Sequence, residues 1–214
     1  MDAMLYQASD RVASPAISVA TSDWRAGLPV VAAAGVALRE LRASDAQTLF
    51  ALLTTEEVSR FISPPPTSVD GFARFIAWTE RERITGNYVC FGIVPAGCTA
   101  AVGLIQIRRH GADWSTAEWG FAIGTPYWGT GLFVAAATAV REFAFASLGV
   151  DRLEARTAVA NGRGAGALRK LGATEEAMLR KSLCIRGTRV DQMLWTLWRR
   201  PAFDCKAVWG PRRH

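Results

Sequence analysis

A short glycine-containing loop holds the residues with the clearest chemical potential in this sequence. The segment Trp128-Gly129-Thr130-Gly131 stands between a strand expected to end at Ile123 and a helix expected to begin at Leu132. Two glycines at the start of a helix let the backbone approach a ligand closely, with N–H groups directed at it, and the helix dipole favours an anion. Val134 replaces the third glycine of a dinucleotide fingerprint, and the segment lacks the Gly-Lys-Ser/Thr of a mononucleotide P-loop. We therefore predict an anion site at this helix start, with a tight structural turn as the alternative.

A second group of polar residues follows the next expected strand. Asn161 and Arg163 come directly after that strand, and the short helix that follows ends with Arg169 and Lys170. The cations suit the phosphates of a ligand bound at the glycine loop. For Arg163 and Arg169, the alternative is a solvated helix face.

These residues must be positioned by strands and helices that alternate along the chain. Alternating apolar residues predict strands, and apolar residues three and four positions apart predict helices. The first helix is expected to start with a capping box formed by Ser44 and Gln47. The elements follow in the order β, α, α, β, β, β, α, β, α, β, β, in which the first β is a hairpin of the runs 28–31 and 36–41. The other strands are expected near 88–94, 101–108, 117–123, 152–160, 178–185 and 188–198. We predict an α/β fold of the α+β type, with a mixed, mostly antiparallel central sheet flanked by helices.

The composition is that of a folded protein with one domain. The chain has 214 residues, of which 50% are hydrophobic and 21% charged, and its formal net charge is +6. Residues 1–150 carry 11 Lys and Arg against 13 Asp and Glu, a net charge of −2, whereas residues 151–214 carry 14 against 6, a net charge of +8. The basic last third suits a phosphate-bearing cofactor, an acidic partner or a nucleic acid.

Several common classes of protein are excluded by what the sequence lacks. It has no apolar run of about 18 residues, and its first ten residues do not form a secretory signal. The four cysteines are scattered without metal-ligand spacing and without a nearby histidine pair, so we expect them to be reduced and buried: Cys90, Cys98, Cys184 and Cys205. We expect a cytoplasmic protein with no metal and no membrane partner.

Four motifs, taken in order and spacing, resemble the GNAT superfamily of N-acetyltransferases. They are Trp128-Gly129-Thr130-Gly131, Arg152-Leu153-Glu154-Ala155, Asn161 and Lys170-Leu171-Gly172. The similarity is to the branch of the ribosomal-protein-alanine N-acetyltransferases. It implies a single GNAT-like domain over residues 28–200, preceded by a poorly ordered arm over residues 1–27 and followed by a tail over residues 201–214.

This resemblance implies acetyl-coenzyme A as cosubstrate and a set of residues that contact it. The pyrophosphate would lie on the backbone at the start of the helix, the pantetheine arm along the preceding strand, and the adenosine phosphates near the cations that follow Asn161. Asn161 itself would lie near the thioester. The residues so implied are Phe121, Ile123, Trp128, Gly129, Thr130, Gly131, Leu132, Phe133, Asn161, Arg163 and Lys170.

Glu118 is the candidate catalytic base. An amine must lose a proton before it attacks a thioester, so the site needs a base or a water path to one. Glu118 alternates away from Trp119 and Phe121, and the small residues on its own side of the strand leave room for a substrate. A surface glutamate is the alternative. His110 precedes a Gly-Ala-Asp loop and is expected to be a loop residue rather than a base, and Trp114 is a candidate for the acceptor mouth.

Two departures from the family pattern leave the reaction without an assigned general acid. Gly164 stands where this branch usually has serine, and Leu168 stands where many members have tyrosine. We therefore expect the thiolate to leave directly or with help from water.

The expected function is transfer of an acetyl group from acetyl-coenzyme A to a primary amine, either a protein N-terminus or a small molecule, by direct attack on the thioester. The alternatives are a basic RNA- or ribosome-binding module and a GNAT-fold protein that binds the coenzyme without turnover. Nucleic acid is not the expected partner, and the protein is expected to be a monomer or a homodimer.

Overall fold

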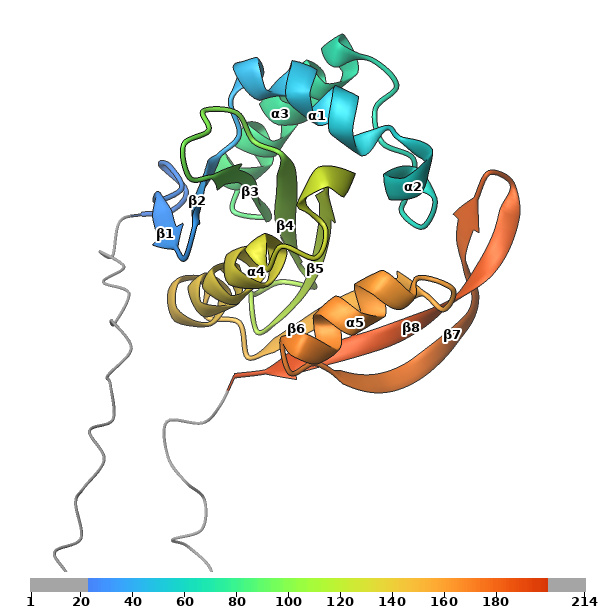
Figure 1. Cartoon of the computed structure of the whole chain (residues 1–214). Coiled ribbons are helices and arrows are strands. Elements are labelled where there is room, and N and C mark those ends of the chain that lie inside the picture. Colours follow the sequence, from blue (N-terminus) through green and yellow to red (C-terminus); the bar gives the residue numbers. More distant parts are fainter. Residues whose placement is uncertain (1–22, 200–214) are drawn as a thin grey trace, which may run out of the picture.

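A computed structural model describes residues 23–199 (Figure 1). Eight strands form one sheet in the order β1-β2-β3-β4-β5-β6-β8-β7, and all neighbouring pairs are antiparallel except β5 and β6. The strands are β1 (Val31–Ala33), β2 (Val36–Glu40), β3 (Tyr88–Pro95), β4 (Gly103–Arg109), β5 (Thr116–Ile123), β6 (Arg152–Ala158), β7 (Thr174–Ile185) and β8 (Thr188–Trp198). This confirms the predicted mixed, mostly antiparallel sheet.

Helices pack on both faces of the sheet, which explains why β3 is buried along nearly its whole length (Figure 1). Phe91 on β3 packs against Phe143 of the central helix, while Tyr88 and Cys90 on the other face of β3 belong to a second core formed with the first helices. The helices are α1 (Ala46–Leu53), α2 (Glu56–Ser59), α3 (Val69–Ile84), α4 (Leu132–Phe143) and α5 (Gly162–Lys170), and α4 continues into a π-helical turn over Ala144–Leu148.

The sheet forks between β5 and β6. These two strands pair in parallel only over three positions, from Thr116 with Arg152 to Glu118 with Glu154. Beyond this point β5 stays paired with β4 up to Ile123, while β6 stays paired with β8. The edge of β5 that faces the fork is therefore free of a neighbouring strand.

The start of the first helix differs from the sequence prediction. The expected capping box at Ser44 is wrong, because a 3₁₀ turn over Ala43–Asp45 comes first and the buried carboxylate of Asp45 organises it. That carboxylate accepts two hydrogen bonds of 2.8 Å from Arg39 and one each from the backbone N–H of Arg42 and Ala101, at 2.8 and 2.9 Å. Burial raises the pKa of Asp45, but the hydrogen bonds from Arg39 and the two backbone groups outweigh it and hold the pKa below its usual value.

The domain also begins earlier than residue 28. Trp24 is buried, and its ring packs edge-on against Trp114 with 5.5 Å between centroids, so the described end of the predicted arm is part of the core. The rest of that arm, residues 1–22, and the predicted tail over residues 201–214 lie outside the described residues.

Candidate active site

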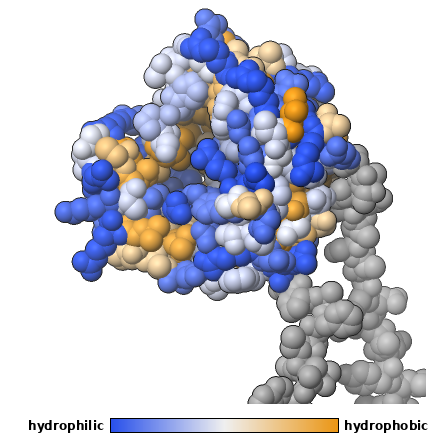
Figure 2. Space-filling view, turned by 180° about the vertical axis from the view of Figure 1, so that it is seen from behind, coloured by the Kyte–Doolittle hydropathy of each residue, from blue (hydrophilic) through white to orange (hydrophobic). Residues whose placement is uncertain are grey.

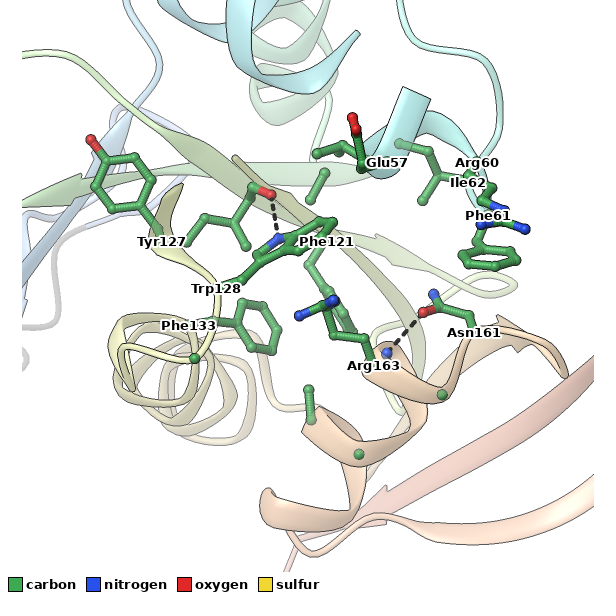
Figure 3. A pocket seen from close by; sticks show the side chains of 18 of the residues that line it. Glu57, Arg60, Phe61, Ile62, Phe121, Tyr127, Trp128, Phe133, Asn161 and Arg163 are labelled. Atoms are coloured by element: carbon green, nitrogen blue, oxygen red, sulfur yellow. Dashed lines mark hydrogen bonds between the residues drawn. The ribbon is translucent and has the colours of Figure 1, made fainter. Parts of the chain in front are cut away.

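A cavity of about 880 Å³ lies at the fork and is walled by four segments of the chain (Figure 3). They are α2 with the residues that follow it, the end of β5, the loop that leads into α4 with the first turn of that helix, and α5 with the two residues before it. Seen from behind, the surface is hollowed and apolar side chains show in the hollow (Figure 2). Most of the predicted coenzyme residues line this cavity: Phe121, Ile123, Trp128, Gly129, Gly131, Phe133, Asn161, Arg163 and Lys170.

The glycine loop has the backbone conformation that its sequence implies. Gly129 and Gly131 have φ values of 75° and 83°, and Gly131 is the N-cap of α4. Thr130 and Leu132 are not among the residues that line the cavity; instead, the Thr130 hydroxyl donates to the carbonyl of Tyr127 at 2.9 Å and accepts from the N–H of Leu132 at 3.3 Å. The first turn of a helix leaves N–H groups without intrahelical partners, so the loop presents donors beside the cavity.

An arginine stacked on a tryptophan joins two walls of the cavity. The Trp128 indole N–H donates to the carbonyl of Ile123 at 2.9 Å, which fixes the ring against the end of β5 (Figure 3). The guanidinium carbon of Arg163 on α5 lies 3.8 Å from the centroid of that ring. Arg169, in contrast, pairs with Glu175 at 2.5 Å and lies over Trp195, away from the cavity lining.

Asn161 caps α5 and also faces the cavity (Figure 3). Its Oδ1 accepts from the N–H of Gly164 at 2.9 Å, which leaves its amide N–H₂ as a donor. A Cβ built on Gly164 would lie 2.7 Å from Asn161 Nδ2. Glycine at this position, where serine was expected from the resemblance, therefore leaves room for the capping side chain of Asn161. Leu168 is fully buried in the core and does not line the cavity. Neither position offers an acid to a leaving thiolate.

Aromatic packing forms the β5 wall. Phe121 packs against Phe133 of α4 with 4.6 Å between ring centroids and edge-on against Trp119 at 5.9 Å. Trp119 itself lies in the core and does not line the cavity; its indole N–H has no hydrogen-bond partner among the described residues. An apolar wall, a free strand edge and the N–H groups at the start of α4 fit an extended ligand with amide groups and a phosphate end, such as coenzyme A.

Glu118 lies at the base of the fork and not in the cavity lining. Its side chain is 31% exposed, and its Oε2 lies 3.2 Å from His110 Nε2 and 3.4 Å from Arg156 Nη1. The sequence predicted space for a substrate beside Gly120, on the Glu118 side of β5. The side chain of Gln106 fills part of that space, because a Cβ built on Gly120 would lie 3.0 Å from Gln106 Nε2. Whether Glu118 is the base stays a prediction.

Three features of this region differ from or add to what the sequence indicated. His110 is brought to Glu118, although its position before a loop gave no sign of this. The segment around α2 supplies Arg60, Phe61 and Ile62 to the cavity, and the proline run that follows it was the available signal. The suggestion that Trp114 lines the acceptor mouth is wrong, because its buried indole donates to the carbonyl of Gly86 at 3.2 Å.

Within residues 23–199, no helix is long and apolar enough to cross a membrane. The same residues contain no group of three His, Cys, Asp or Glu placed to hold a metal ion. Cys90 on β3 is buried as predicted, but the prediction is wrong for Cys98, which lies in the connection after β3, and for Cys184 near the end of β7; both are exposed, and Cys205 lies outside the described residues.

Comparisons with known proteins agree with the geometry. A family model described as an acetyltransferase (GNAT) domain matches residues 36–174, more than half of the chain. An uncharacterized N-acetyltransferase of Bacillus licheniformis, p20, is 24% identical over 164 residues, which cover 76% of this chain and 92% of that protein.

Two solved structures share the fold. Mycobacterium smegmatis RimJ in complex with CoA-disulfide has a TM-score of 0.73 at 22% identity, covering 82% of this chain and 88% of that chain. The microcin C7 self-immunity acetyltransferase MccE, in complex with acetyl-CoA and AMP, has a TM-score of 0.69 at 18% identity, covering 77% and 93%. The family match over more than half of the chain decides the assignment: the chain belongs to the GNAT acetyltransferase family and is an acetyl-coenzyme A-dependent N-acetyltransferase.

Proposed function

We propose that this enzyme transfers the acetyl group to a primary amine at the β5–β6 fork, with the amine attacking the thioester directly. The observation that carries the proposal is the cavity itself, which joins the glycine loop, the free edge of β5 and the start of α5 in one space. A cavity open at the fork gives two ligands access to the same point. The coenzyme would enter beside α4 and α5, and the acceptor would enter beside α2.

On the coenzyme side, the chain offers backbone donors and two cations. The pyrophosphate would bind the N–H groups from Gly129 to Phe133, where the φ values of the two loop glycines keep the backbone open to a ligand. Arg163 and Lys170 lie on the same wall of the cavity and carry the positive charge that phosphates require. The pantetheine arm would run along Phe121 and Ile123, because amide groups can pair there with an unpaired strand edge.

On the acceptor side, Glu118 would take the proton of the amine through water. Its Oε2 already has two partners, and no partner is recorded for its Oε1 among the described residues, so that oxygen is available to accept. A backbone N–H of β5 would stabilise the charge that develops on the thioester oxygen. The thiolate is a good leaving group, because a free thiol has a pKa of about 8.5, so the missing acid at Gly164 and Leu168 does not prevent the reaction.

The location of the positive charge argues against the RNA-binding alternative. In the described part of the basic last third, five arginines pair with carboxylates: Arg152, Arg156, Arg169, Arg186 and Arg199. Paired arginines contribute little net field, so the +8 of this region overstates the charge available to a nucleic acid.

Calorimetric titration with acetyl-coenzyme A, followed by a thiol-release assay against peptides, polyamines and aminoglycosides, tests the proposal. We expect saturable binding and acceptor-dependent thiol release. In Glu118→Gln, binding should be unchanged and turnover should fall roughly 10²-fold or more. Binding without thiol release from any amine would favour the non-turnover alternative. Salt-dependent RNA binding without coenzyme binding would favour the RNA-binding module.

A further inference from the structure

The carboxylate of Glu118 is held through one oxygen only. His110 Nε2 and Arg156 Nη1 both approach Oε2, at 3.2 and 3.4 Å, from different strands. His110 follows β4, and Arg156 lies on β6 just past the last paired position of the fork. One hydrogen-bonding contact and one ion pair at the same oxygen restrict the carboxylate, and Oε1 has no partner among the described residues.

The loop that carries His110 is held by several contacts. The N–H of His110 donates to the carbonyl of Thr116 at 2.9 Å, which closes the connection between β4 and β5. Within that connection Asp113 accepts from both the N–H and the hydroxyl of Ser115, at 3.0 and 2.6 Å, and Trp114 is buried in the core. A side chain on such a loop has a defined position relative to the strand that carries Glu118.

The charged groups on the elements around this cluster are Arg108 and Arg109 on β4, Asp113 in the loop, and Glu154 and Arg156 on β6. Glu154 is bonded to Arg152 at 2.7 Å, and Arg109 donates to the carbonyl of Ala112 at 2.7 Å, so neither is positioned on Glu118. Among the described residues, the Glu118 carboxylate is therefore held by His110 and Arg156.

We propose that His110 is a positioning residue for Glu118: the imidazole donates from Nε2 to Oε2 and thereby leaves Oε1 free to take the proton of the acceptor amine through water. This inference rests on the proposed function, because it assumes that Glu118 is the base.

Two substitutions at this position separate positioning by a donor from a general loss of structure. His110→Ala removes the donor, and we expect kcat to fall about tenfold, part of the roughly 10²–10⁴ that a positioned base contributes, with an unchanged KM for acetyl-coenzyme A. His110→Gln keeps an N–H donor near the place of Nε2 and should restore most of kcat. His214→Gln, which removes the other histidine of the chain, is the control and should behave as the wild type.

A second measurement needs no acceptor. Donation from Nε2 to a carboxylate fixes one tautomer of the neutral ring, and ¹⁵N NMR of the ring nitrogens reads that tautomer directly. We expect the Nε2–H form for His110 in the wild type and a loss of that preference in Glu118→Ala. Unchanged ring shifts in that variant would overturn the contact.

The failures of the two proposals are distinguishable. Full activity of His110→Ala, or a loss of kcat in His110→Gln as large as that in His110→Ala, overturns the role of His110 while acetyl transfer stands. If the wild type acetylates no amine of the panel, the proposed function fails, and the positioning role fails with it.

Discussion

Replacing Gly131 by alanine separates the strain of the loop backbone from its role in coenzyme binding, because the chain contains a matched control. Gly131 and Gly172 both have φ of 83°, and a Cβ built on either meets nothing within 4 Å. An L-residue in this left-handed conformation costs about 1–2 kcal/mol. Alanine at either position should therefore lower the free energy of unfolding by about that amount and lower Tm by several degrees.

Coenzyme affinity should distinguish the two variants. Gly131 lines the cavity at the start of α4, whereas Gly172 follows α5 and does not line it. A methyl group at Gly131 would hold a phosphate away from the loop N–H groups. A hydrogen bond to a charged group contributes about 1.5–3 kcal/mol. Its loss weakens binding about 10- to 150-fold, since each 1.4 kcal/mol is a factor of ten.

Urea unfolding without ligand gives the stability of the wild type, Gly131→Ala and Gly172→Ala, and isothermal calorimetry gives their dissociation constants for acetyl-coenzyme A. We expect similar losses of stability and a loss of affinity in Gly131→Ala alone. Equal affinity in the two variants would show that the pyrophosphate does not bind at this loop. Unchanged stability in both would refute the strain argument.

Three further predictions follow from contacts in the structure. Asp45→Asn leaves a buried arginine without its partner and should lower the free energy of unfolding by about 3–5 kcal/mol, measured in urea. Burial raises the pKa of Asp45, but its hydrogen bonds hold that pKa below the unfolded value. Its stabilisation is therefore complete above about pH 4 and is lost as the pH falls through the folded pKa; acid unfolding should show this loss in the wild type and not in the variant. Arg163→Ala removes a cation from the cavity wall and its stacking on Trp128. Coenzyme affinity should fall about 5- to 30-fold at low salt and less at high salt, and the free energy of unfolding should change by less than about 1 kcal/mol. Gly164→Ser should displace Asn161 from its capping position, lowering stability by about 0.5–2 kcal/mol without raising thiol release; higher turnover would contradict the reason given for this glycine.

The sequence determined the features that depend on local chemistry. Gly129 and Gly131 could be assigned to a ligand-approaching loop because only glycine adopts such φ values at little cost, and the strand before and helix after it follow from short-range periodicity. Asn161 could be placed between a strand and a short helix from the same periodicity, and the structure shows that its Oδ1 caps that helix. The order of the strands and helices follows from the same local signals.

The tertiary structure decided which residues from distant segments meet. Nothing in the periodicity of the chain shows that β5 and β6 separate after Glu118, because a fork depends on how the two halves of the sheet twist and pack against α4 and α5. Asp45 replaced Ser44 as the organiser of the first helix because its partners, Arg39 and Ala101, come from other elements.

Contacts between distant segments also explain why His110 lies beside Glu118 and why much of the basic region is paired. The ring of His110 reaches Glu118, eight residues further along the chain, only because the connection between β4 and β5 folds back on itself. The sequence could not show which arginines of the last third pair with carboxylates and which stay unpaired. The fold neutralises Arg156 and Arg169 with carboxylates and leaves Arg163 at the cavity, so the charge that serves the coenzyme is set by position in space and not by composition.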